Sequence, residues 1–254
     1  MLLPNRSGGY SFLRGIGPYS AGVAAAPGFA IEHVRLAQAV PLRTGFAAVE
    51  ARLAVAGRPR AALCAMALRS PAPFTFPGFA AFNASYVELL KAWDLLLDGV
   101  NPVARTNVAP ELDPPGEPSL YSFSYTVPAA GAPLSFVVAG AGELPEGSLR
   151  PEDVVRGGEN TPDALAAKAR FVLDLMKGRL HGLGAAWERV TATNIYTVHD
   201  VNALLPAEIL PRIGAAGRHG VVWHYTRPPI VSIEYEMDLR GGVSESIFDA
   251  GSAT

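Results

Sequence analysis

The chain repeats one order of sequence patterns, and this repeat constrains its fold more than any other feature. In the first copy, VARTNV (103–108) is followed by a Pro-rich loop and the alternating segment YSFSY (121–125). In the second copy, AGRHGV (216–221) is followed by a Pro-containing loop and IEYEM (233–237). An arginine opens an expected strand in each copy, Arg105 and then Arg218. Because the copies differ at polar positions, we expect one composite site rather than two equal ones.

The local patterns predict the same element order in both halves: strand, helix, strand, helix, strand, strand. A continuous apolar run such as ALCAMAL (62–68) is typical of a buried strand, and apolar residues at three- and four-residue spacing indicate a helix. The expected strands are 31–40, 62–68, segments around Arg105 and Tyr121, 134–140, 189–198 and two more at the end; the expected helices are 45–56, 79–97, 162–180 and 203–213. We expect Thr44 and Thr161 to begin helices, because a side-chain oxygen there accepts a hydrogen bond from the first turn.

A linker rich in Pro, Gly and Ala at 128–133 separates the two halves. It predicts a first domain over residues 1–128 and a second over 129–254. A strand that returns to a parallel neighbour through a helix forms a βαβ unit. We therefore expect an α+β fold in which each half is a mixed sheet with two helices on one face.

The composition excludes several classes of protein. The net charge of −2 argues against nucleic acid as a partner, because phosphate binding needs clustered Lys and Arg. No apolar run approaches the roughly 20 residues that span a bilayer, so we expect no membrane segment. The single cysteine, Cys64, excludes an internal disulfide. These features predict a soluble, cytoplasmic protein.

The ordered series of motifs resembles the reactive-intermediate deaminase (Rid, or YjgF) family in tandem form. GPYS (17–20) is similar to the N-terminal motif of that family, and FAAFNASYVELL (79–90) followed by 102–108 is similar to its second helix and arginine strand. In the second half, 136–140 and 231–237 resemble the strand before Ser-Gly-Gln and the glutamate strand. The resemblance covers nearly the whole chain, although Ala141 stands where the family has Gln.

The resemblance implies a chorismate-mutase-like fold that assembles as a trimeric barrel with sites between neighbouring domains. It also implies hydrolysis of enamines and imines to ketones and ammonia without a cofactor. Among Rid relatives, the diverged halves best fit 2-aminomuconate deaminases of aromatic-amine degradation. A muconate has two carboxylates, so Arg105 and Arg218 could each bind one. We expect a small carboxylate substrate and a homo-oligomer, a trimer of tandem chains.

The resemblance and the chemistry together assign the expected site. Glu234 is expected to protonate the enamine carbon and activate water, while Arg105 holds a carboxylate through paired hydrogen bonds. Tyr19 and Asn83 are expected to position the substrate. Glu234 and Glu236 lie two apart on an expected strand and so share a face, which is equally a pattern for a solvent face. We leave Glu236 to that structural interpretation.

Four further residues complete the expected substrate-binding set: Arg218, His219, Gly140 and Trp223. Whether Arg218 or His219 corresponds to Arg105 stays open, because the alignment needs a one-residue shift. The histidines lack the spacing of a zinc site, so we expect no metal.

Two alternatives to a deaminase with a composite site remain. The chain could be a non-catalytic module that binds small carboxylic acids and needs no acid group. It could also combine an active half with a structural half, in which case Arg105→Ala would cost stability or assembly rather than activity.

Overall fold

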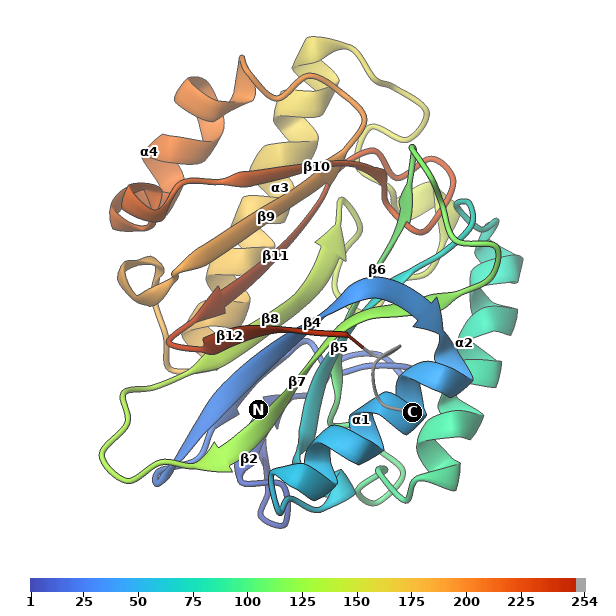
Figure 1. Cartoon of the computed structure of the whole chain (residues 1–254). Helices are drawn as coiled ribbons and strands as arrows, with labels where there is room; N and C mark the ends of the chain where they lie inside the picture. Colours follow the sequence, from blue (N-terminus) through green and yellow to red (C-terminus); the bar gives the residue numbers. More distant parts are fainter. Residues whose placement is uncertain (250–254) are drawn as a thin grey trace.

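A computed structural model describes residues 1–249 as one α+β structure around a twelve-stranded mixed sheet (Figure 1). The strands are β1 (Leu2–Asn5), β2 (Tyr10–Leu13), β3 (Gly22–Ala25), β4 (Phe29–Pro41), β5 (Leu63–Arg69), β6 (Ala104–Pro110), β7 (Ser119–Pro128), β8 (Phe136–Gly142), β9 (Ala192–Thr197), β10 (Val222–Arg227), β11 (Glu236–Gly241) and β12 (Ser244–Phe248). The helices are α1 (Leu42–Val55), α2 (Phe76–Ala92), α3 (Pro162–Gly182) and α4 (Leu210–Ile213). The expected α+β class with a mixed sheet is confirmed.

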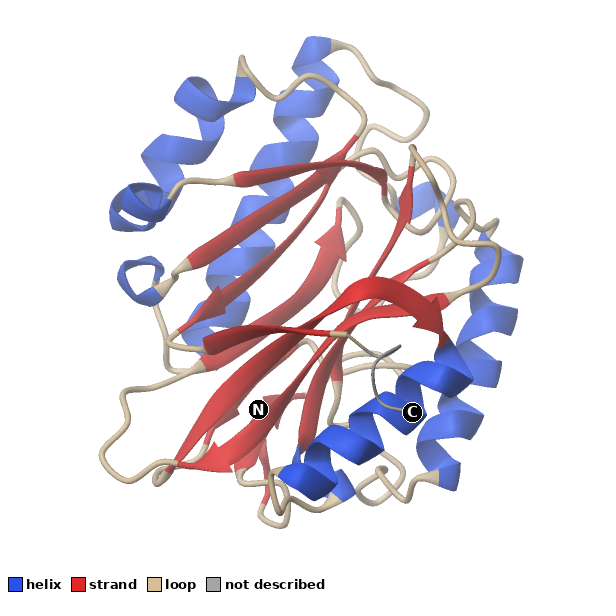
Figure 2. Ribbon diagram, viewed as in Figure 1, coloured by secondary structure: helices blue, strands red, loops and turns tan. Residues whose placement is uncertain are grey.

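The repeat in the sequence corresponds to a repeat in strand pairing. In the first half, β5 lies parallel to β6 and antiparallel to β7, and β7 is antiparallel to β4. In the second half, β9 lies parallel to β10 and antiparallel to β11, and β11 is antiparallel to β8. Each half therefore has four strands in the same relative order, and the helices of the two halves lie on opposite sides of the strands (Figure 2).

Strands from the two halves also pair with one another, so the sheet is continuous across them. β3 pairs with β8, β10 pairs with the end of β6, and β12 crosses from the second half to lie parallel to β4. The sequence did not predict β1, β2, β3 or β12. These strands have only four or five residues each, too few to show a clear alternation of apolar and polar residues, and they form because they pair with neighbouring strands. The division into domains at 128/129 stays a prediction.

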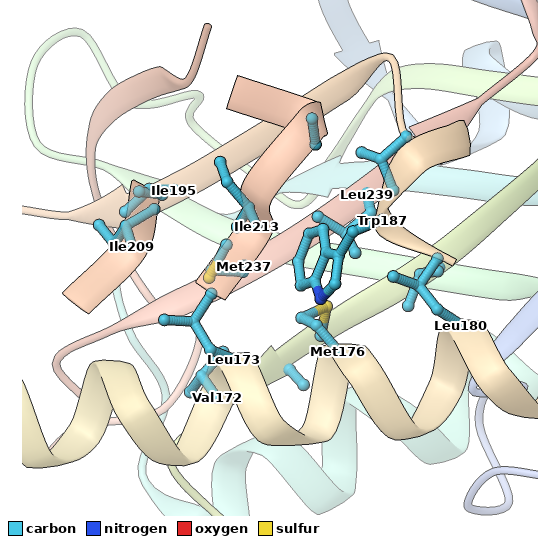
Figure 3. Close-up of a cluster of buried hydrophobic side chains, with 14 of the residues drawn as sticks. Val172, Leu173, Met176, Leu180, Trp187, Ile195, Ile209, Ile213, Met237 and Leu239 are labelled. Atoms are coloured by element: carbon cyan, nitrogen blue, oxygen red, sulfur yellow. The ribbon is translucent and has the colours of Figure 1, made fainter. Parts of the chain in front are cut away.

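The two halves have separate apolar cores beneath their helices. In the second half, α3 turns Val172, Leu173, Met176 and Leu180 toward the sheet, where Met237 and other side chains of β11 and its neighbours meet them (Figure 3). The helix keeps its apolar residues at three- and four-residue spacing along this face, as an amphipathic helix does.

Helix ends differ in part from expectation. Thr161 begins α3 by accepting a hydrogen bond from the Ala164 N–H at 3.3 Å, as predicted. Thr44 does not begin α1, because that helix starts directly after Pro41 without a side-chain cap. Thr75 begins α2 instead, through a 3.1 Å bond from the Gly78 N–H. The expected helix at 203–213 is a π-type turn over Leu205–Ile209 followed by the short α4.

Candidate active site

A cavity lies where the two halves meet, and both halves contribute charged side chains to its lining. The first half supplies Tyr19 from the N-terminal arm and Arg105 from β6. The second half supplies Gly140 from β8, Arg179 from α3 and Glu236 from β11. The site that we expected between a first-half and a second-half domain therefore has a counterpart within a single chain.

Arg105 is 2% exposed and lies among aromatic rings. Its guanidinium carbon is 4.6 Å from the ring centroid of Tyr19 and 4.7 Å from that of Tyr86, with the rings of Phe79 and Phe82 slightly farther away. Burial among these groups lowers the pKa of Arg105 from its ordinary value. Aromatic faces attract the cation but accept no ordinary hydrogen bond, so its N–H groups stay available.

Asn83 on α2 orients the guanidinium. Its Oδ1 accepts a 2.7 Å hydrogen bond from Nη2 of Arg105. The Nε and Nη1 atoms of Arg105 and the Nδ2 atom of Asn83 are buried and have no hydrogen-bond partner among residues 1–249. Buried donors without a protein partner are costly and rare, so they mark a position that suits a hydrogen-bond acceptor of a ligand. An anionic ligand such as a carboxylate would satisfy the guanidinium donors.

Hydrogen bonds hold the arm that carries Tyr19 against the segment that leads into β6. The Ser20 N–H donates to the Val103 carbonyl at 3.0 Å, and the Asn101 side chain donates to the Pro18 carbonyl at 2.6 Å. A Cβ on Gly15 would lie 2.4 Å from the Tyr19 carbonyl oxygen, so only glycine fits there. Burial raises the pKa of Tyr19, which keeps its phenol protonated as a hydrogen-bond donor.

Glu236 is the carboxyl group of this cavity that has no cationic partner within hydrogen-bond distance among residues 1–249, unlike Glu146. It is 4% exposed and makes no side-chain hydrogen bond to any residue in 1–249. Burial raises its pKa well above the ordinary value, and the neighbouring Asp238 adds to this shift, whereas Arg179 and Arg105 oppose it. A carboxyl group that stays protonated toward neutral pH can act as a general acid.

Gly140 leaves the space that Glu236 occupies. A Cβ at this position would lie 2.1 Å from Oε1 of Glu236 and 3.1 Å from a methyl group of Thr106. The carboxyl end of a glutamate can move aside, so a larger residue would displace the acid rather than prevent folding.

We therefore expect Gly140→Ala to fold normally and to lower kcat by about 10- to 100-fold, because a misplaced catalytic group loses much of its effect. Steady-state kinetics together with thermal unfolding measure this. Gly178→Ala on α3 is the matched control, since a Cβ there meets nothing within 4 Å. Equal kinetics for Gly140→Ala and wild type would contradict the assigned position of the acid.

Arg179 and Glu146 form an ion pair at the cavity lining. Nε and Nη2 of Arg179 donate to the two carboxylate oxygens of Glu146 at 2.6 and 3.0 Å. Nη1 of Arg179 donates to the carbonyl oxygens of Ala139 and Gly140 at 2.9 and 3.3 Å. The end of α3 is thereby tied to β8 and to the loop that follows it.

Glu234, the expected acid, lies outside this cavity. Its Oε2 atom is 2.8 Å from Nε2 of His199, and its side chain is 21% exposed. The expectation that Glu234 faces Arg105 is not met, and Glu236 occupies that place. The reason is that β11 begins at Glu236, so Glu234 belongs to the preceding loop rather than to the strand.

A buried ion pair holds this loop out of the sheet. Glu143 and Lys168 are both fully buried with 2.9 Å between Oε1 and Nζ. The carboxylate of Glu143 also accepts hydrogen bonds from the backbone N–H groups of Glu234 and Tyr235, at 2.7 and 3.1 Å. These N–H groups therefore do not bind a neighbouring strand, and the strand starts one residue later.

The structure also separates Arg218, His219 and Trp223 from the cavity. Arg218 and His219 are exposed in the 3₁₀ turn Gly214–His219, and Arg218 donates to the Ala215 carbonyl. Trp223 lies on β10, is 40% exposed and donates to the Thr197 carbonyl at 2.9 Å. Trp223 is the second residue of β10, as Arg105 is the second residue of β6, so neither Arg218 nor His219 corresponds to Arg105.

Besides Glu236, which we left to a structural role, the lining contains four polar residues that the sequence patterns did not identify: Asn107, Glu146, Ser148 and Arg179. Asn107 lies two residues after Arg105 on β6 and so shares its face, which is a usable signal. Arg179 interrupts the apolar face of α3 between Met176 and Leu180, and a charged residue on such a face is also a signal. Glu146 and Ser148 lie in the loop after β8, where no periodic pattern indicates which side chains face the cavity.

Residues 1–249 contain no group of three or more His, Cys, Asp or Glu side chains that could hold a metal ion. Within the same range, no helix combines the length and apolar character needed to cross a membrane.

Comparisons with known proteins identify relatives over nearly the full length. The family model described as 2-aminomuconate deaminase CnbZ matches residues 2–246. A 2-amino-5-chloromuconate deaminase of Comamonas testosteroni is 45% identical over 243 residues, which is 94% of this chain and 96% of that protein. A chorismatase crystal structure shares 12% identity over 94% of this chain and 78% of its own, with a TM-score of 0.48. A YjgF/YER057c/UK114-family structure from Mycobacterium tuberculosis shares 18% identity over 43% of this chain and 79% of its own, with a TM-score of 0.25.

Proposed function

Because the chain belongs to the 2-aminomuconate deaminase CnbZ family and is thus a deaminase, we propose that it hydrolyses a 2-aminomuconate-type enamine to the 2-oxo acid and ammonia. The observation that carries this proposal is that Arg105 from the first half and Glu236 from the second half line the same cavity. A guanidinium with unpaired N–H groups suits a substrate carboxylate. A buried, protonated carboxyl group suits proton transfer to carbon.

The first step is protonation of the enamine. Arg105 binds the carboxylate next to the amino-bearing carbon, and Tyr19 and Asn83 orient the substrate beside it. Glu236 donates its proton to the enamine carbon while the nitrogen lone pair forms the C=N bond. The products of this step are an iminium ion and the Glu236 carboxylate. The positive charge on the iminium is close to the carboxylate that has just formed, which stabilises both.

The second step is hydrolysis of the iminium. The Glu236 carboxylate removes a proton from water as the oxygen attacks the C=N carbon, giving a carbinolamine. The regained proton is transferred to nitrogen, the C–N bond breaks, and ammonia leaves as the C=O bond forms. Loss of the remaining hydroxyl proton restores protonated Glu236. Glu236 therefore serves as acid, base, acid and base in turn.

Ammonia release from freshly generated 2-aminomuconate tests the proposal. We expect one ammonia per enamine consumed, well above the spontaneous rate, and 2-amino-5-chloromuconate is the second substrate to assay. The measurement couples ammonia to glutamate dehydrogenase and follows loss of the dienamine absorbance. Folded protein that binds the substrate without accelerating ammonia release would overturn the proposal and favour a carboxylate-binding module.

The proposed reaction needs only side chains of this chain, so we propose that it is independent of metal and organic cofactor. Protein dialysed against a chelator should keep its full rate in the same assay. A trimer of tandem chains and a cytoplasmic location stay predictions.

A further inference from the structure

Arg179 is a second buried guanidinium at the cavity, and its partner Glu146 is half-exposed. The Arg179 side chain is 8% exposed, whereas the Glu146 side chain is 48% exposed. Arg179 is anchored by its helix and by the carbonyl oxygens of Ala139 and Gly140. Glu146 lies on the loop after β8, next to Gly147 with a φ of 80°. The cation is therefore held by the backbone and screened from water, whereas its carboxylate partner is accessible to water and to a competing ligand.

The geometry of this pair is that of a bound carboxylate. Two N–H groups of Arg179 point at the two oxygens of Glu146 in the parallel arrangement that arginine forms with a free carboxylate. A substrate carboxylate placed there would make the same two hydrogen bonds. It would need only to displace a half-exposed side chain.

We propose that Arg179 is the binding residue for the second carboxylate of a dicarboxylate substrate, and that Glu146 occupies this position until the substrate displaces it. The proposal rests on the proposed function, which supplies a substrate with a carboxylate at each end. Arg179 thereby takes the place that the sequence had suggested for Arg218, which lies outside the cavity.

Both arginines line the cavity that also contains Tyr19 and Glu236. A dicarboxylate held by Arg105 at one end and Arg179 at the other would therefore lie in the cavity that holds the proposed acid. The same arrangement gives specificity, because a monocarboxylate leaves the Arg179–Glu146 pair intact and gains nothing from it.

The test compares two six-carbon dienes that differ only at one end: trans,trans-muconate, with two carboxylates, and sorbate, with one. Their Kd values are measured by calorimetry on the full chain. Glu146→Gln removes the competing charge and nearly preserves size. We expect its Kd for muconate to fall about fivefold, as for loss of a half-exposed competing ion pair, while its Kd for sorbate stays unchanged.

Glu159→Gln is the matched control. Glu159 forms a similar two-point pair with Arg156, at 2.8 and 2.6 Å, but on the surface and away from the cavity. We expect this variant to leave both Kd values unchanged. Arg179→Met should remove the preference for muconate over sorbate, and circular dichroism checks that it folds.

Three outcomes would overturn the proposal: weaker muconate binding by Glu146→Gln, equal tightening for both ligands, or no change for either. The result is separable from the proposed reaction. Ammonia release with an unchanged muconate preference in Glu146→Gln would refute only the role of Arg179. A selective gain for muconate without ammonia release from any enamine would refute only the reaction.

Discussion

Glu236→Gln is expected to lower kcat by about 10²- to 10⁴-fold, the usual contribution of a general acid–base residue, and to leave the Kd for muconate nearly unchanged. Glutamine keeps the size of the side chain and can still donate a hydrogen bond, but it cannot give a proton to carbon or take one from water. Because Glu236 has no side-chain partner in residues 1–249, the substitution breaks no internal ion pair. Rapid-quench measurement of ammonia, with calorimetry for binding, gives both quantities.

The dependence of kcat/KM on pH is an independent test of Glu236 as the general acid. Burial raises the pKa of Glu236, so the free enzyme holds the required proton below that raised pKa and loses it above. The value of kcat/KM should therefore fall as pH rises through this pKa. The residual activity of Glu236→Gln should lack that decline.

Glu234→Gln is the control for this prediction. It makes the same chemical change two residues away, at a side chain that contacts His199 instead of the cavity. We expect activity close to that of wild type. A large loss in Glu234→Gln together with near-normal activity in Glu236→Gln would reverse the assignment and return the acid to Glu234.

The confusion between these two glutamates shows the limit of local sequence patterns here. Alternation across IEYEM places Glu234 and Glu236 on one face of a strand that starts at Ile233. The structure starts β11 at Glu236, because Glu143 takes the N–H groups of Glu234 and Tyr235 from a position about 90 residues away in the sequence. No pattern near residue 234 reports such a contact. The sequence predicted that this segment forms a strand, but it did not predict the residue at which the strand begins.

The first half of the site was easier to predict. Arg105, Asn83 and Tyr19 lie close together, as we expected. The motifs that contain them, in the arm, α2 and β6, follow the same order in this chain as in the family that it resembles. Arg218 failed for a local reason. Gly214 and Gly220 both have positive φ, so the segment turns where the repeat suggested a strand. Arg179 lies on α3, outside the motifs of the family. Its only sequence signal is that an arginine stands on the otherwise apolar face of this helix.

Arg105→Met is expected to lower kcat/KM by about 10²- to 10³-fold, as for the loss of a buried charge that pairs with a ligand. The same change should leave the free energy of unfolding within about 1 kcal/mol of wild type, or raise it, because an apolar side chain suits a pocket lined by Tyr19, Phe79, Phe82 and Tyr86. Arg105→Lys should recover little activity, since an ammonium group lacks the planar fork that fits a carboxylate. Steady-state kinetics and denaturant unfolding measure the two effects.

Arg69→Met separates this prediction from a general effect of removing a buried arginine. Arg69 is also buried, lies on the neighbouring strand β5 and packs 3.9 Å from the ring centroid of Tyr121, but it does not line the cavity. We expect this variant to keep its activity. If Arg105→Met instead lost several kcal/mol of stability while the folded fraction remained active, Arg105 would be a structural residue. A loss of activity without a loss of stability is the result that a substrate-binding arginine requires, because its unpaired N–H groups cost the free protein stability that only the ligand recovers.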